Sequence, residues 1–203
     1  MHRFVLALLL SLAFAPASAQ DVRGWSLDPG ALVAGNDLLR RAPDREVDAL
    51  FQAVHAAARD DARAPALCAL FDPGADRSLE ALNAAALELD PASRERFATA
   101  IAGVLVAALQ SPPQPWDAAA AKQSLKAAGA TAAILHDGFI AGLNARGDDG
   151  DGRAARCRSL HWLLDAMRSR PAPERAAMTR LLLAQGLSYL GGATPELTPH
   201  ATP

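Results

Sequence analysis

Alanine constrains the fold of this chain more than any other residue, because it fills 48 of the 203 positions. It is the best helix former, and it adds little apolar area to a core. Aromatic residues, which strands favour together with β-branched ones, make up only 5% of the chain. The composition therefore predicts an all-α fold, a single multi-helix bundle whose helices pack closely through small side chains. Leucine is expected to supply most of the larger core side chains.

Apolar residues at helical spacing, together with capping residues, locate the expected helices. Residues 46–59 carry apolar side chains at intervals of three and four, which predicts one buried helical face. Asp90-Pro91 is typical of a helix start, with an aspartate cap before a proline at the first helical position. The stretch from Phe97 to Leu109 carries no charge and is too short to cross a bilayer, so we expect it to be the central core helix.

The second half of the chain predicts three more helices. Asp117 is expected to cap a long helix that runs to about Ala145, with Leu135, His136 and Ile140 among its inward-facing residues. Two shorter helices are expected over residues 153–170 and 173–190. The first would end at a proline and the second at a pair of glycines.

The two ends of the chain differ in composition from this helical domain, which we expect to span residues 46–190. Residues 20–45 contain glycines and prolines at short intervals, which indicates an irregular N-terminal arm. Residues 191–203 are rich in proline and threonine and offer nothing to a core, so a disordered tail is expected there.

Residues 1–19 predict export. Arg3 precedes an apolar stretch, Phe4–Ala15, and Ala17-Ser18-Ala19 is a small-x-small cleavage motif. The apolar stretch is shorter than the ~20 residues that a membrane-spanning helix needs. We therefore expect a secretory signal peptide that is cut between Ala19 and Gln20. The mature protein is then periplasmic or secreted and retains no membrane span.

The charge balance argues against two classes of partner. The chain carries 20 basic and 22 acidic residues, and one of the basic residues leaves with the signal peptide. No basic stripe is present, which argues against nucleic acid. No segment joins a polybasic face to bulky apolar residues, which argues against binding to a membrane surface.

Two stretches of the chain, Phe51–Cys68 and Phe139–Cys157, resemble each other. Each begins with phenylalanine, contains a pair of aspartates and ends in cysteine. A duplication would give two pseudo-repeated helical units that meet at an axis. Chance similarity in a chain rich in alanine and arginine is the alternative, and both remain open.

Cys68 and Cys157 are the two cysteines of the chain. In an oxidising compartment an even number of cysteines favours a disulfide, which would stabilise this chain by roughly 4 kcal/mol. Two buried free thiols are one alternative. Metal ligation is another: Cys157 and His161 lie one helical turn apart on one face, and Cys68 with His136 would complete a four-ligand zinc site.

One pattern among the histidines could be catalytic. His161 is followed four residues later by Asp165, so a carboxylate could orient its imidazole as a general base. His55 and His136 lie on or beside apolar stripes, where a histidine is more often a core residue. The chain has no P-loop, no dinucleotide-binding motif and no serine-nucleophile motif, so no cofactor is expected. The acidic stretch 146–152 lacks the glutamate that an EF-hand requires at its twelfth position.

These observations predict an exported, non-enzymatic helical protein that binds a partner protein or a small apolar ligand through its helical surfaces. Two alternatives remain. One is a periplasmic hydrolase-type enzyme with a site near His161 and Asp165. The other is a metal-binding protein that uses cysteine and histidine.

Overall fold

The alanine-rich chain is helical through most of the residues that the structure describes. A computed structural model describes residues 35–59, 64–70, 72, 75–76, 78–146 and 149–190, without the side chains of residues 79, 82, 83, 189 and 190. These residues form nine α-helices and no strand, which confirms the predicted all-α fold. The expected signal peptide (1–19) and tail (191–203) lie outside them. The helices are α2 (Gly35–Arg41), α3 (Asp44–Ala58), α4 (Ala64–Ala69), α5 (Leu79–Glu88), α6 (Pro91–Gln110), α7 (Ala118–Leu135), α8 (Phe139–Leu143), α9 (Gly150–Arg168) and α10 (Ala172–Leu190).

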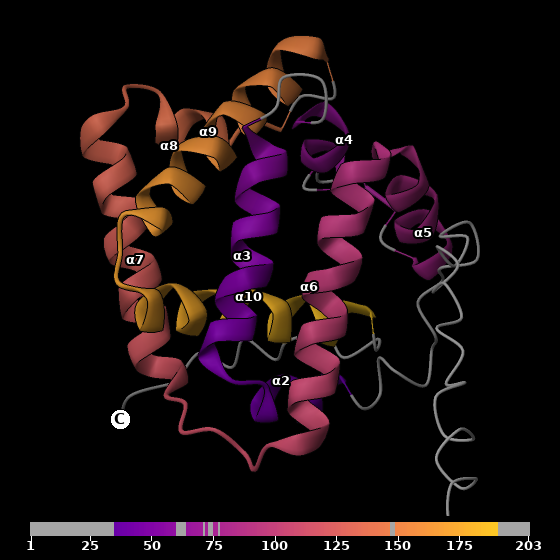
Figure 1. Cartoon of the computed structure of the whole chain (residues 1–203). Coiled ribbons are helices and arrows are strands. Elements are labelled where there is room, and N and C mark those ends of the chain that lie inside the picture. The colour runs from indigo at the N-terminus through magenta and orange to yellow at the C-terminus, as the bar shows by residue number, and fades with distance from the viewer. Residues whose placement is uncertain are drawn as a thin grey trace, which may run out of the picture.

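Helices α3 and α10 form the centre of the bundle. In Figure 1, α3 stands between α7 and α6, and α10 crosses behind them. Helix α3 packs against α10 and α6, whereas α10 also contacts α7 and α2. Helix α9 crosses the upper end and contacts α8, α7 and α4 (Figure 1).

Alanine makes up most of the core itself. Of the 21 buried hydrophobic residues in the described part of the chain, twelve are alanines and three are leucines. Among the nine other buried hydrophobic residues leucine is the most frequent, and seven further leucines pack partly buried against the core, which agrees with the expectation for the larger side chains. The largest fully buried apolar side chains are Phe51, Phe139, Met167, Met178 and Val47. Most of them meet in one cluster among α3, α8, α9 and α10, where small neighbouring side chains allow the helices to approach closely.

Capping residues begin the helices as the sequence indicates. The side chains of Asp90 and Asp117 each accept hydrogen bonds from two backbone N–H groups in the first turn of α6 and α7, which confirms both predicted caps. Asp149 caps α9 by accepting from the backbone N–H of Gly152 at 2.7 Å. Helix α9 therefore begins at Gly150, three residues earlier than expected, and the acidic stretch supplies its start.

Helix α2 corrects part of the predicted irregular arm (20–45). Residues 35–41 are helical, with Leu39 buried in a cluster that joins α2 to α3, α6 and α10. Arg41 donates to the carboxylate of Asp37 one turn earlier, at 2.8 Å. The acidic residue lies in the first turn and the basic residue in the last, an order that favours the helix dipole. Gly35 is the first residue of this helix and Pro43 lies beyond its end, so neither interrupts it.

Helix α6 is not the central core helix that its uncharged sequence predicts. Its buried residues are small (Ser93, Ala100 and Ala108), whereas its larger side chains near the C-terminal end face outward, and Leu109 is 78% exposed. Helix α3 packs against the small-residue face, since a Cβ at Gly103 would lie 3.0 Å from the Glu46 carboxylate. Lack of charge alone did not place this helix, because close packing between helices selects small side chains over large apolar ones.

The long helix expected over residues 118–145 is broken. Helix α7 ends at Leu135, and Gly138 adopts φ +87°, a left-handed conformation that glycine accommodates without strain. The short helix α8 then starts in a new direction, which buries Phe139. Leu135 and Ile140 are exposed rather than inward-facing as predicted.

Gly142 allows α8 to lie directly against α9. A Cβ at this position would collide with the Ser159 hydroxyl and would lie 2.6 Å from the backbone oxygen of Ala155. We expect Gly142→Ala to lower the free energy of unfolding by about 1–3 kcal/mol through overpacking, measured by urea denaturation. Gly129→Ala is the matched control, because a Cβ there meets nothing within 4 Å and alanine favours the helix. Equal effects of the two substitutions would contradict the proposed contact.

The two similar stretches of the sequence do not form equivalent helices. Phe51 lies within the 15-residue α3, whereas Phe139 begins the five-residue α8. Cys68 lies in a six-residue helix and Cys157 in one of 19 residues. The helix lengths therefore give no support to two pseudo-repeated units.

Candidate functional site

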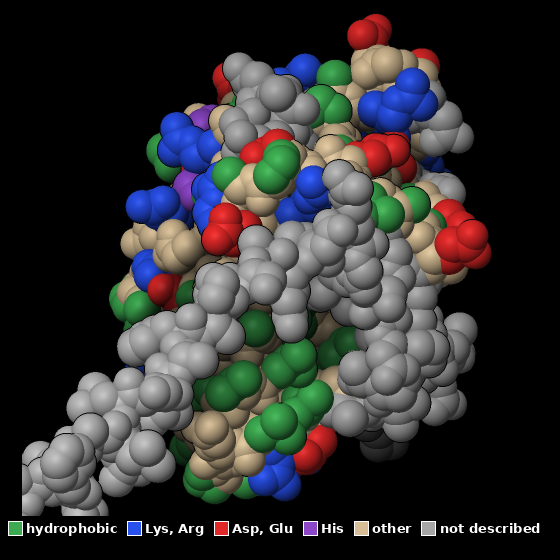
Figure 2. Space-filling view, turned by 45° about the vertical axis from the view of Figure 1, so that its right-hand side comes forward, with side chains coloured by type: hydrophobic (Ala, Val, Ile, Leu, Met, Phe, Trp, Pro, Cys, Tyr) green, Lys and Arg blue, Asp and Glu red, His purple; other side chains and the backbone are tan. Residues whose placement is uncertain are grey.

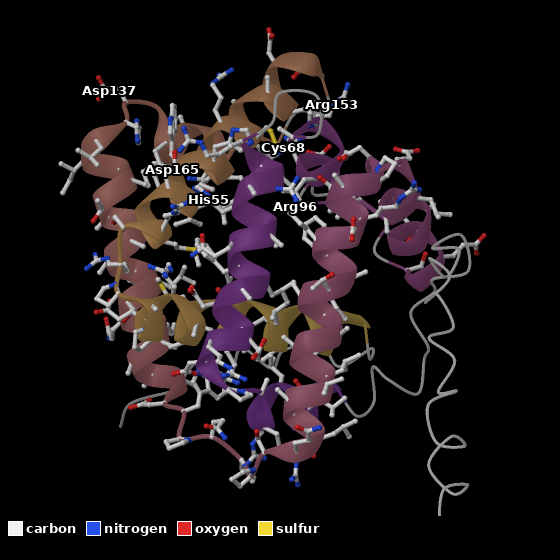
Figure 3. All side chains as sticks on the ribbon, viewed as in Figure 1. His55, Cys68, Arg96, Asp137, Arg153 and Asp165 are labelled. Carbon is white, nitrogen blue, oxygen red and sulfur yellow. A yellow bond between two sulfur atoms is a disulfide. The ribbon has the colours of Figure 1, made fainter. Side chains whose placement is uncertain are left out.

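The two cysteines form a disulfide, which is the pairing that the sequence favours. Cys68 in α4 and Cys157 in α9 are 89 residues apart in the chain, and their Cα atoms are 5.2 Å apart. Cys68 is buried, and the bond fastens the short helix α4 to α9 (Figure 3). Free thiols are therefore excluded for this state of the protein.

His161 lies beside the disulfide. Its Nε2 atom is 3.6 Å from Sγ of Cys157 and 3.8 Å from Sγ of Cys68. Three of the four predicted metal ligands, Cys68, Cys157 and His161, therefore lie together. They line one pocket of about 470 Å³, which Asp72, Arg153 and four other residues also line. The fourth, His136, stacks on Trp162 with the ring centroids 4.7 Å apart and is not part of this group.

The hydrogen bonds pair Asp165 with His55 rather than making the expected His161–Asp165 site. Nε2 of the buried His55 is 2.7 Å from the Asp165 carboxylate, and Nδ1 is 3.4 Å from the Arg168 guanidinium (Figure 3). A guanidinium can only donate, so Nδ1 accepts and Nε2 carries the proton that it donates to Asp165. Both ring nitrogens are engaged, which suits a core histidine and leaves neither free to act as a general base.

Three further arginines join distant segments. Arg156 donates to Asp72 at 2.7 and 2.9 Å, and Arg180 donates to Asp44 at 2.7 Å. Arg175 donates to both carboxylate oxygens of Asp48, and these hydrogen bonds raise the pKa of the Arg175 guanidinium. Each pair spans at least 84 residues of sequence, so local spacing gave no sign of it. These contacts fix the positions of helices relative to one another.

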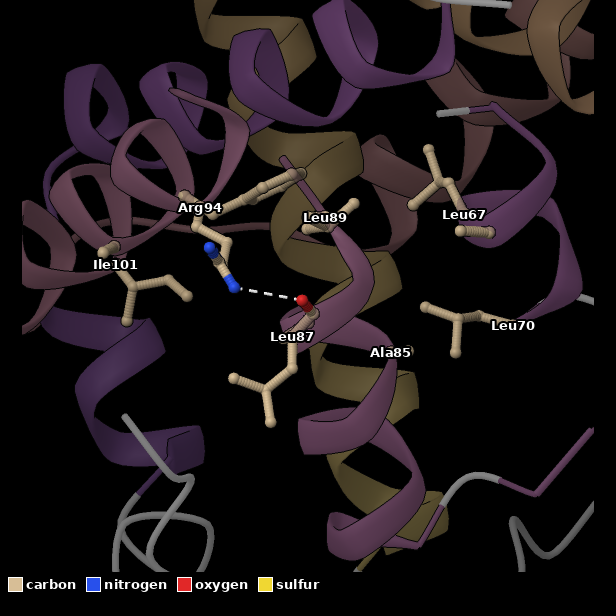
Figure 4. Close-up of a pocket in the computed structure, with 11 residues that line it drawn as sticks. Leu67, Leu70, Ala85, Leu87, Leu89, Arg94 and Ile101 are labelled. Atoms are coloured by element: carbon tan, nitrogen blue, oxygen red, sulfur yellow. Dashed lines mark hydrogen bonds between the residues drawn. The ribbon is translucent and has the colours of Figure 1, made fainter. Parts of the chain in front are cut away.

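An apolar pocket lies where α4, α5 and α6 meet (Figure 4). Its volume is about 160 Å³. Ten of its eleven lining residues are alanine, leucine, isoleucine or phenylalanine, and the eleventh is Arg94. Nη1 of Arg94 donates to the backbone oxygen of Leu87 at 3.0 Å, shown by the dashed line in Figure 4. This site could not be predicted from the sequence, because its walls come from three separate helices.

Nε of Arg94 is buried and has no hydrogen-bond partner among the described residues. The same part of the chain offers this guanidinium no carboxylate in an ion pair. The Arg94 side chain as a whole is half-buried, but a buried donor atom without a partner is costly unless an acceptor reaches it. Arg94 therefore makes this pocket suitable for a ligand with an anionic group.

Exposed apolar side chains continue from the pocket along α6. Ile101 lines the pocket, and Leu105, Val106 and Leu109 extend the same helix outward. Figure 2 shows hydrophobic side chains gathered on the lower part of the face that α6 turns toward the viewer. A second exposed group surrounds the junction of α7 and α8, where Ile134 is 82% exposed.

Comparisons with known proteins do not identify this chain: no family model, no curated protein and no solved structure matches it. Among the described residues, no helix is long and apolar enough to cross a bilayer.

Proposed function

We propose that this protein is an exported binding protein whose pocket between α4, α5 and α6 takes a small carboxylic acid with an apolar body. The sequence of residues 1–19 supports export, and so does the disulfide, since disulfides form and persist mainly in oxidising compartments. The observation that carries the ligand is the single guanidinium, that of Arg94, in an otherwise apolar wall.

The size and lining of the pocket set the apolar part of the ligand. A dry cavity of about 150 Å³ can hold a six-carbon ring, so a pocket of about 160 Å³ suits a body of roughly six to eight carbons. Burial of each methylene contributes about 0.8 kcal/mol, and ten apolar lining residues offer no competing polar partner. A mainly polar ligand would lose its hydration here without replacement.

The Arg94 guanidinium sets the head group. It is always protonated, and its planar donors match the two oxygens of a carboxylate. One donor already bonds the Leu87 carbonyl, which fixes the guanidinium at the pocket wall. A carboxylate beside it would accept from the remaining donors and neutralise the charge.

Three eight-carbon probes that differ only in their head group test the assignment. We expect octanoate to bind more tightly than octanol and octylamine in isothermal titration calorimetry. Arg94→Met should weaken octanoate binding roughly 10- to 100-fold, because a hydrogen bond to a charged group contributes about 1.5–3 kcal/mol. Octanol binding should change little.

Arg96→Met is the matched control, since Arg96 lies on the same helix but is exposed and donates to the Ala92 backbone. Ala98→Leu, which adds bulk to the pocket wall, should weaken all three probes. Octanoate affinity that survives Arg94→Met would contradict the head-group assignment. Absence of binding by all three probes would contradict the pocket as the ligand site.

The other expected partner, a protein, stays a prediction, with the exposed apolar group at the junction of α7 and α8 as its candidate surface. The hydrolase-type alternative has little support, because Asp165 is engaged by His55 and Arg168 occupies the other nitrogen of that ring.

A further inference from the structure

The disulfide and His161 are arranged like three ligands of a metal site in which a covalent bond joins the two sulfur ligands. The Sγ atoms of Cys68 and Cys157 and Nε2 of His161 all lie within 4.8 Å of one another. These atoms belong to α4 and α9 and line a different pocket from the one that contains Arg94. This group of atoms is therefore separate from the proposed ligand pocket.

The distances fit tetrahedral zinc. Zinc binds thiolate at about 2.3 Å and imidazole nitrogen at about 2.0–2.1 Å, so the nitrogen–sulfur edge of a tetrahedral site is about 3.6 Å and the sulfur–sulfur edge about 3.8 Å. The two nitrogen–sulfur distances of the protein are 3.6 and 3.8 Å. Only the sulfur–sulfur edge, which the covalent bond closes, has to open.

We propose that Cys68, Cys157 and His161 form a redox-gated zinc site, closed while the disulfide is present and able to bind Zn²⁺ once it is reduced. A thiolate of a dithiol reductant attacks one sulfur and forms a mixed disulfide, releasing the other sulfur as a thiolate. The second thiol of the reductant then displaces the first cysteine, so the protein gains two electrons and the reductant becomes a cyclic disulfide. Zinc binding displaces the protons of both thiols.

The surroundings leave room for a fourth ligand. The three side chains line a pocket of about 470 Å³, so a solvent molecule can complete the coordination, as in zinc sites with three protein ligands. Arg153 and Arg158 line the same pocket, and nearby cations favour the thiolate form of cysteine. Two thiolates neutralise the zinc charge, so the bound ion adds no net charge beside the arginines.

The test titrates zinc into the purified protein, oxidised or reduced, against a chromophoric chelator. The reductant is a phosphine, which takes the oxygen of water to become its oxide as the disulfide becomes two thiols. We expect one zinc ion per reduced chain and none per oxidised chain. Cobalt in place of zinc should give a thiolate-to-metal charge-transfer band in the reduced protein alone.

Two histidine variants locate the nitrogen ligand. His161→Gln should weaken zinc binding by the reduced protein at least about 10-fold, since even the loss of an outer-shell partner has that effect. His136→Gln should leave it unchanged. If the reduced chain without metal loses its helical circular dichroism, zinc must restore that signal in the wild type. Equal zinc uptake by the oxidised protein, no uptake by the reduced protein, or wild-type affinity in His161→Gln would overturn the proposal.

Discussion

Replacing both cysteines, in a Cys68→Ala, Cys157→Ala double variant, is expected to lower the free energy of unfolding by about 4 kcal/mol. The bond joins residues 89 positions apart, so its loss frees a long loop in the unfolded chain and raises the entropy of that state. Urea denaturation measures the change. For a chain of this length the melting temperature should fall by about 10 °C.

Reduction provides the control for this double variant. The wild type reduced by a phosphine, with a chelator present to remove zinc, should lose about as much stability as the double variant. The double variant itself should not respond to the phosphine. If the oxidised wild type and the double variant unfold at the same urea concentration, the disulfide does not stabilise the fold.

The disulfide also supports the ligand pocket. Helix α4 has six residues, which is too few for a helix to be stable alone in water. Its residues Ala66 and Leu67 form part of one wall of the ligand pocket. Because the bond fastens α4 to α9, we expect the double variant to bind octanoate more weakly than the oxidised wild type. Stability and ligand binding are then linked through one short helix.

The features that could be predicted from the sequence depend on residues that are neighbours in the chain, or have very few possible pairings. Asp90 and Asp117 cap their helices because a cap needs only its own side chain and the next three residues. The disulfide was predictable because two cysteines allow a single intramolecular pairing. The all-α fold was predictable because the chain is rich in alanine, the residue that most favours a helix.

The features that escaped prediction depend on distant partners. Asp165 meets His55, 110 residues away, so the i, i+4 spacing to His161 pointed to the wrong histidine. The buried face of α6 is chosen by its close contact with α3, which selects small residues over leucine. Nothing in the sequence around Arg94 distinguishes it from a surface arginine, because the other walls of its pocket come from α4 and α5. In each case the deciding contact lies in another helix.

Arg180 carries the second large expected effect, because it caps the end of α2 from another helix. Its side chain is 1% exposed and donates to the backbone oxygens of Leu39 and Ala42 as well as to Asp44. In a continuing helix the Leu39 oxygen would accept from the N–H of residue 43, but that residue is Pro43, which has none. The guanidinium of Arg180 supplies the missing donor.

Arg180→Met keeps much of the side-chain volume and removes these donors, so it separates hydrogen bonding from packing. We expect a loss of about 3 kcal/mol in the free energy of unfolding, since each buried carbonyl left without a donor costs about 1–3 kcal/mol. Asp44→Asn should cost less than about 1 kcal/mol, because the Asp44 side chain is 53% exposed and its ion pair is screened by water. Both losses are measured by urea denaturation. Comparable losses in the two variants would mean that the ion pair, and not the capping of α2, accounts for the contribution of Arg180 to the free energy of unfolding.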